Sequence, residues 1–260
     1  MSAGPHFSPL KAWLGKDGML LRLRLARPKA NIVDAAMIEA LRSALGEHLS
    51  GARLRAVLLD AEGPHFSFGA SVEEHLPESC AGMLRQFHAL ILRLLESPVP
   101  VLVAVRGQCL GGGLEVAAAG HLIFAAPDAN MGQPEIKLAV FAPAASCLLP
   151  ERIGQARAED LLFSGRGIGA EEAHRIGLVN VLADDPEAAA LDYFERFLAP
   201  LSASSLRFAV RAARAGFLSR VAAKLAEVER LYLEDLMATR DAVEGLNAFI
   251  EKRPANWQDR

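Results

Sequence analysis

Two glutamates stand in apolar surroundings near a run of glycines. Glu115 follows three consecutive glycines, 111–113, and its neighbours predict a helix that is apolar on nearly every side. Glu135 follows a proline in 131–136, a loop expected after a strand. A buried carboxylate is costly unless it is paired or functional, so the two glutamates are candidates for general acid–base chemistry. The simpler alternative for Glu115 is a surface glutamate that complements the helix dipole.

The glycine run would leave backbone N–H groups open at the start of that helix. The first N–H groups of a helix have no intrahelical partner, and the helix dipole favours negative charge there. A second N–H from the turn at 69–70 would complete a two-donor site for an oxyanion. Two carboxylates and two N–H donors together describe a site for proton transfer next to a carbonyl group. The alternative is that the glycines only allow a helix and a strand to pack closely.

Other common binding and catalytic motifs are excluded, because their required residues are missing from this sequence. A dinucleotide fingerprint that starts at Gly107 would need glycine where Cys109 stands, and a phosphate loop would need lysine where Gly113 stands. The chain has no Gly-x-Ser-x-Gly elbow, and its seven histidines lack metal-ligand spacing. The sequence therefore predicts no metal site and no bound cofactor.

The composition is that of an ordinary globular protein. The 260 residues include 28 basic and 31 acidic side chains, a formal charge of −3, and 52% are hydrophobic. This balance excludes a disordered chain and argues against a general nucleic-acid binder. Three widely spaced cysteines indicate no disulfide framework, and no uncharged apolar run reaches the roughly 18 residues of a membrane span. We expect a cytoplasmic protein with neither nucleic acid nor membrane as partner.

Strands and helices are predicted to alternate through the first two thirds of the chain. Asp34 is the expected N-cap of the first helix, and the arginines of the first strand are expected on its solvent face. Alternation of this kind indicates βαβ units with parallel pairing. The predicted strands are 19–25, 55–60, 99–105 and 122–126, and the predicted helices are 35–49, 83–95 and 114–119.

From about residue 201 the pattern changes to helices alone. Helices are predicted at 202–216, 219–238 and 241–252. We expect two units, a core at 1–200 and a helical region at 201–260. The apolar stripes of the helical region either contact a neighbouring subunit or cap the core of their own chain.

Several segments, in order, resemble signatures of the enoyl-CoA hydratase/isomerase (crotonase) superfamily. The resemblance implies an α/β fold, a crotonase-like spiral of ββα units with a C-terminal helical trimerisation region. It also implies an acyl-CoA thioester as substrate, with CoA as part of that substrate, and a homotrimer or homohexamer. The segments are 27–30, 66–70, 107–115, 131–135, 163–166, 173–179 and 248–252, and the resemblance covers about residues 20–260.

The resemblance also implies roles for individual residues. Ala70 and Gly112 match the two oxyanion-binding N–H groups, and Glu115 and Glu135 match the pair that activates water and moves the proton. Lys252 alone would otherwise be read as a solvated helix end. The positions that match CoA-binding segments are Lys29, Ala30, Ser71, Val72, Phe249 and Lys252.

The chain departs from the family pattern near the predicted site. Ser71 stands where the family commonly has aspartate. Pro143, which has no N–H, stands about where a glycine N–H helps to position water. Phe68 and Phe141 would make the acyl pocket bulkier and more aromatic than usual.

These departures narrow the expected activity. Together with 29–37 and 66–75, they are most similar to family members that hydrate a cyclic dienoyl-CoA in anaerobic benzoyl-CoA degradation. That resemblance implies the conversion of cyclohexa-1,5-diene-1-carbonyl-CoA to 6-hydroxycyclohex-1-ene-1-carbonyl-CoA. The alternatives are a short-chain enoyl-CoA hydratase or enoyl-CoA isomerase and, in another class, a crotonase-fold RNA-binding protein. The retained glutamates and the net charge argue against RNA binding.

Overall fold

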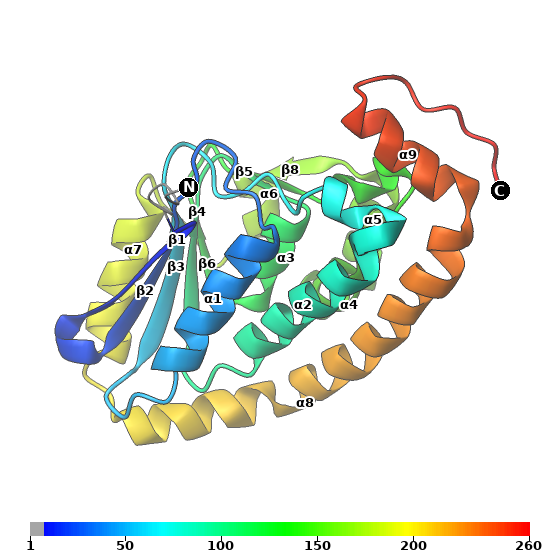
Figure 1. Cartoon of the computed structure of the whole chain (residues 1–260). Coiled ribbons are helices and arrows are strands. Elements are labelled where there is room, and N and C mark those ends of the chain that lie inside the picture. The colour runs from blue at the N-terminus through cyan, green and yellow to red at the C-terminus, as the bar shows by residue number, and fades with distance from the viewer. Residues whose placement is uncertain (1–7) are drawn as a thin grey trace, which may run out of the picture.

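A six-stranded sheet forms the centre of the computed structural model, which describes residues 8–260 (Figure 1). Residues 1–7, which belong to the predicted core unit 1–200, lie outside this range. β1 pairs antiparallel with β2, and the other neighbours pair parallel, which confirms the expected βαβ arrangement. In sheet order the strands are β1 (Leu10–Gly15), β2 (Leu20–Leu25), β3 (Ala56–Ala61), β4 (Val101–Val105), β6 (Leu122–Ala125) and β9 (Val181–Leu182).

A second, smaller sheet and nine α-helices complete the part of the chain that the structure describes. The small sheet contains β5 (Gln108–Leu110), β7 (Asn130–Gly132) and β8 (Gly167–Gly169). The helices are α1 (Ala35–His48), α2 (Pro77–Leu95), α3 (Gly112–Ala119), α4 (Pro143–Ile153), α5 (Gln155–Ser164), α6 (Ala170–Arg175), α7 (Pro186–Tyr193), α8 (Ala203–Arg230) and α9 (Arg240–Ile250).

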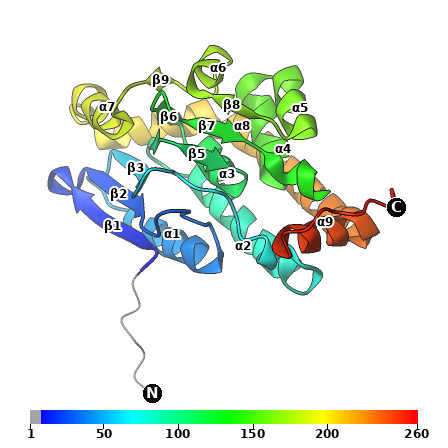
Figure 2. The same cartoon turned by 90° about the horizontal axis from the view of Figure 1, so that it is seen from above.

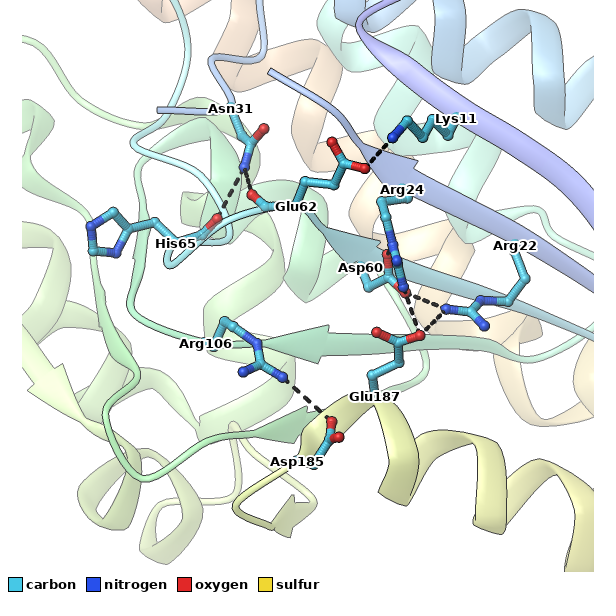
Figure 3. Close-up of polar contacts among 10 residues, drawn as sticks. All are labelled: Lys11, Arg22, Arg24, Asn31, Asp60, Glu62, His65, Arg106, Asp185 and Glu187. Carbon is cyan, nitrogen blue, oxygen red and sulfur yellow. Dashed lines mark hydrogen bonds and ion pairs between the residues drawn. The ribbon is translucent and has the colours of Figure 1, made fainter. Parts of the chain in front are cut away.

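Apolar side chains cover both faces of the large sheet. Leu21 and Leu23 of β2 join the main core with α1, α2 and α3, whereas Leu20 packs on the opposite face with residues of α7. The prediction that the arginines of this strand face solvent was therefore wrong. Arg22 is only 8% exposed, and it pairs with Asp60 of β3 at 2.6 Å and with Glu187 of α7, as Figure 3 shows.

Several predicted elements are confirmed with changed boundaries. The Asp34 side chain accepts a hydrogen bond from Met37 N at 3.0 Å, so it caps α1 as expected. α2 begins at Pro77, six residues before the predicted start, because proline is well suited to the first helical position. The two helices predicted at 202–216 and 219–238 form one helix, α8, followed by a π turn at Leu231–Asp235.

The C-terminal helices pass beneath the core and return to its upper side. α8 runs along the lower edge in Figure 1 and contacts α2 and α4. Seen from above, α9 lies beside the start of α2 (Figure 2). There α9 contacts two short 3-10 helices, Glu73–His75 and Pro134–Leu138. No helix within residues 8–260 is both long and apolar enough to cross a membrane.

Candidate active site

A cavity of about 370 Å³ lies where these segments meet. The start of α3, the 3-10 helix Pro134–Leu138 and the start of α4 form one side, and α2 with the turn before it forms the other. α9 contributes Phe249 to the wall. The wall is mostly apolar, and it includes Ala70, Gly112, Glu115 and Glu135. The structure therefore brings all four predicted catalytic residues to one cavity.

The two predicted oxyanion donors lie side by side. A β-carbon at position 112 would lie 3.1 Å from the backbone nitrogen of Ala70. Within residues 8–260, neither Ala70 nor Gly112 donates its N–H to a protein atom. Gly112 begins α3, so its N–H has no intrahelical partner. Two unpaired N–H groups at a helix start form a suitable site for a negatively charged oxygen.

Backbone hydrogen bonds fix the two donor segments to each other. Ser67 N donates to Gln108 O, and Leu110 N donates to Ser67 O, both at 3.0 Å. The fully buried Asn31 side chain donates to the carbonyl oxygens of Glu62 and His65 at 3.0 Å each, as Figure 3 shows. The loop that leads to Ala70 is thus held from both sides, which preorganises the donor pair.

Glu115 is a buried carboxylate that points at the start of another helix. It is 4% exposed, and its Oε1 accepts a hydrogen bond from Ala145 N at 2.7 Å. Burial raises the pKa of Glu115, while the N–H groups of Ala144 and Ala145 partly offset this increase. Pro143 lacks an N–H and is the first residue of α4, so the next two residues supply the donors.

Glu135 lies on the 3-10 helix that faces the glycine turn. Burial raises the pKa of Glu135, and the charge of Glu115 raises it further. With its amide nitrogen turned toward Glu135, the buried Gln133 donates to Oε1 at 3.1 Å and to Oε2 at 3.0 Å. Gly111 has φ +49°, and a β-carbon there would lie 2.5 Å from Glu135 Oε1. Only glycine therefore allows this carboxylate to approach the donor turn.

The predicted CoA-binding residues fall into two groups. Val72 and Phe249 line the cavity. The other four do not line it. Lys29 and Lys252 are exposed on the surface. The Ala30 carbonyl accepts a hydrogen bond from Phe68 N at 2.9 Å, and the Ser71 hydroxyl donates one to Glu73 at 2.9 Å. Phe68 and Phe141 line the cavity, as the sequence predicted.

Three polar side chains near the site were not singled out from the sequence. Gln133 lies inside a recognised motif, but only the structure places its amide at Glu135. His75 lines the cavity. Tyr232 is fully buried, and its ring stands edge-on to Phe141 at 5.2 Å. Local periodicity does not mark His75 or Tyr232: His75 ends a short 3-10 helix, and Tyr232 lies in the π-helical segment that follows α8.

Comparison with known proteins gives consistent matches. The family described as Enoyl-CoA hydratase/isomerase matches residues 15–260. The chain is 72% identical to cyclohexa-1,5-dienecarbonyl-CoA hydratase of Thauera aromatica over 97% of this chain and 98% of that protein. It is 33% identical to human mitochondrial methylglutaconyl-CoA hydratase over 88% of this chain and 70% of that protein.

Solved structures agree with the fold. The crystal structure of an enoyl-CoA hydratase/isomerase from Pseudoalteromonas atlantica superposes with a TM-score of 0.84 at 28% identity, and the match covers 96% of this chain and 99% of that one. The expected α/β crotonase-like fold with C-terminal helices is thereby confirmed. The chain belongs to the enoyl-CoA hydratase/isomerase family.

Proposed function

We propose that this protein adds water to cyclohexa-1,5-diene-1-carbonyl-CoA and forms 6-hydroxycyclohex-1-ene-1-carbonyl-CoA in anaerobic benzoyl-CoA degradation. The observation that carries the proposal is that buried Glu115 and partly buried Glu135 share one cavity with two unpaired N–H groups. The 72% identity to the Thauera aromatica enzyme supports the cyclic diene as acyl group.

The bond changes fit an oxyanion-stabilised route. Water adds its oxygen to ring carbon 2, and the electrons of the double bond between ring carbons 1 and 2 move onto the thioester oxygen. The resulting dienolate is conjugated through the second double bond, so it takes up a proton at ring carbon 5. The remaining double bond joins ring carbons 1 and 6 and is conjugated with the thioester, while ring carbon 2 carries the hydroxyl. After renumbering, this is the 6-hydroxy product, and no oxidant or reductant is consumed.

Ala70 and Gly112 bind the thioester oxygen through their N–H groups in this proposal. Charge on that oxygen grows as water attacks, so the two hydrogen bonds strengthen in the transition state. Each such donor lowers the barrier by about 3 kcal/mol in measured cases. The fixed geometry of the donor segments means that little reorganisation accompanies the reaction.

Glu115 acts as base and Glu135 as acid. The N–H groups at the start of α4 favour the ionised form of Glu115, which takes a proton from water. The charge of Glu115 favours the protonated form of Glu135, which gives a proton to the ring. Different environments thus separate the roles of two carboxyl groups. Gln133 orients Glu135.

The acyl pocket suits a flat ring. Phe68, Phe87 and Phe141 line the cavity, and Pro143 closes its side at the start of α4. Aromatic walls of this kind pack against the faces and edges of an unsaturated ring.

The remaining predicted residues bind CoA, Val72 and Phe249 at the cavity wall and the other four outside it. Lys29, Ala30, Ser71 and Val72 lie on the segments that lead to the donor loop, while Phe249 and Lys252 close the site from the C-terminal side. We further propose that residues 201–260 form a helical unit distinct from the core 1–200, that it joins copies into a homotrimer or homohexamer, and that the enzyme works in the cytoplasm.

Incubation with the cyclic diene and with crotonyl-CoA, followed by liquid chromatography, tests this function. We expect fast hydration of the diene and little change in crotonyl-CoA. In deuterium oxide, the route above places deuterium on product carbon 3, whereas direct addition across the second double bond would place it on carbon 5. Hydration of crotonyl-CoA alone would reduce the assignment to a general enoyl-CoA hydratase.

A further inference from the structure

His75 contributes a polar group to the acyl cavity that the mechanism does not use. It ends the 3-10 helix Glu73–His75, directly before α2, and its side chain lines the cavity. Only three other polar side chains line the cavity among the described residues: Glu115, Glu135 and Lys137. Among the described residues, His75 is therefore the one polar side chain of the wall that is neither a carboxyl group nor an amine.

One hydrogen bond fixes the tautomer of this imidazole. His75 Nδ1 lies 2.7 Å from the carbonyl oxygen of Ser71. A carbonyl oxygen only accepts hydrogen bonds, so Nδ1 carries the proton and Nε2 carries a lone pair. Burial lowers the pKa of His75, which keeps the ring neutral near neutral pH. Within residues 8–260, no group donates a hydrogen bond to Nε2.

We infer that Nε2 of His75 accepts a hydrogen bond from the hydroxyl that the reaction places on the acyl ring, and so makes the cavity selective for hydroxylated cyclic acyl groups. The inference deepens the proposed function and rests on it. Lys137 only donates hydrogen bonds, and the proposed mechanism already uses the carboxyl groups of Glu115 and Glu135 as base and acid. His75 is then the acceptor in the cavity wall that the proton transfers do not use.

A matched ligand pair tests the inference without turnover of the diene. The pair is 2-hydroxycyclohexane-1-carbonyl-CoA, whose hydroxyl is on the carbon that water attacks, and cyclohexane-1-carbonyl-CoA. A site that hydrogen-bonds a ligand hydroxyl disfavours the analogue that lacks it. We expect wild-type protein to bind the hydroxylated ester about fivefold more tightly, the worth of one ordinary hydrogen bond. Calorimetry gives both dissociation constants, and chromatography of the recovered esters checks that neither was converted.

Substitutions at position 75 test whether His75 acts as a hydrogen-bond acceptor or only as part of the cavity wall. His75→Phe keeps the bulk and removes Nε2, so we expect the fivefold ratio to fall to about one while affinity for the unsubstituted ester stays within about twofold. His75→Gln retains an acceptor and is expected to restore part of the ratio. His174→Phe is the matched control, because His174 Nδ1 also faces a carbonyl oxygen, that of Val179 at 3.0 Å, outside the cavity wall.

Two results would overturn the inference. One is equal affinity of wild-type protein for both esters, and the other is an unchanged ratio in His75→Phe. Either result leaves the proposed function standing if wild-type protein hydrates the cyclic diene. A different result would refute the proposed substrate and keep the role of His75. In that case wild-type protein does not hydrate the diene but still prefers the hydroxylated ester, and His75→Phe loses this preference.

Discussion

At the scale of single residues, the two cavity glutamates carry the proposed proton transfers. We expect Glu115→Gln and Glu135→Gln each to lower kcat at least about 100-fold, because each removes one proton-transfer group. The glutamine side chains keep the shape of the wall, so binding of cyclohexane-1-carbonyl-CoA should change little. Steady-state kinetics and calorimetry check both parts. Full activity in either variant would remove that residue from the mechanism.

The charge states of the same pair predict the pH dependence. Activity needs ionised Glu115, so it rises with pH through the pKa of that group, and it needs protonated Glu135, so it falls as pH rises through the pKa of that group. Burial raises both pKa values, so both limbs of kcat/KM should lie above the usual glutamate pKa of about 4.3. The residual activity of Glu135→Gln should lose the alkaline limb. An alkaline limb that persists in this variant would assign the acid to another group.

The buried hydroxyl of Tyr232 leads to a prediction about stability and not about activity. Its hydroxyl is buried and has no hydrogen-bond partner within residues 8–260. Tyr232→Phe removes this unpaired group, so we expect the free energy of unfolding to rise by about 1 kcal/mol. Tyr193→Phe, on the far side of the sheet beside Phe124, should change it by less than about 0.5 kcal/mol. Denaturant titration measures both. A less stable Tyr232→Phe would mean that the hydroxyl has a partner in solution.

At the scale of elements, the start of α3 depends on the absence of side chains. A β-carbon on Gly113 would lie 2.6 Å from the β-carbon of Ser67, so this glycine holds α3 close to the donor loop. We expect Gly113→Ala to lower the free energy of unfolding by about 1–3 kcal/mol and to reduce turnover, because the donor segments must move apart. Unfolding and kinetic measurements check this.

Gly46 of α1 is the matched control for this substitution. A β-carbon there meets no atom of the described residues within 4 Å, and the glycine lies inside a helix. Gly46→Ala should therefore raise the free energy of unfolding by about 0.5–1 kcal/mol and leave turnover unchanged. Equal effects at both positions would show that Gly113 acts only through helix propensity.

Sequence patterns located the elements whose signal is local. Asp34 was identified as a cap because capping is a contact between near neighbours, and Glu115 stood out because its helix is apolar on all sides. β5 was missed, since three residues show no periodicity. The break expected after Gly216 does not occur, because packing of α8 on α2 and α4 outweighs the roughly 1 kcal/mol that a helical glycine costs. The roles of Gln133 and His75 needed tertiary structure, because their partners, Glu135 and Ser71, are close in sequence but only the fold places Glu135 and His75 at one cavity.

At the scale of the whole molecule, α8 presents apolar side chains that residues 8–260 leave uncovered. Phe208 is 69% exposed, and it borders a groove of about 580 Å³ between α8 and the end of α2. Arg207, Arg211 and Leu218 also line this groove. Exposed apolar patches of this kind mark surfaces that bind another protein. The groove therefore supports the proposed association of copies through residues 201–260.

The proposed assembly can be broken at this surface. Phe208→Glu places a charge among apolar side chains that would be buried between copies, so we expect the homotrimer or homohexamer to dissociate into smaller species in sedimentation velocity. Leu14→Glu, at an exposed position on the edge strand β1 that does not line this groove, should leave the assembly intact. Because Phe208 is exposed and the catalytic cavity lies within one chain, dissociated Phe208→Glu should still bind cyclohexane-1-carbonyl-CoA. Unchanged sedimentation of Phe208→Glu would place the contact between copies elsewhere, and loss of binding on dissociation would show that a second copy completes the site.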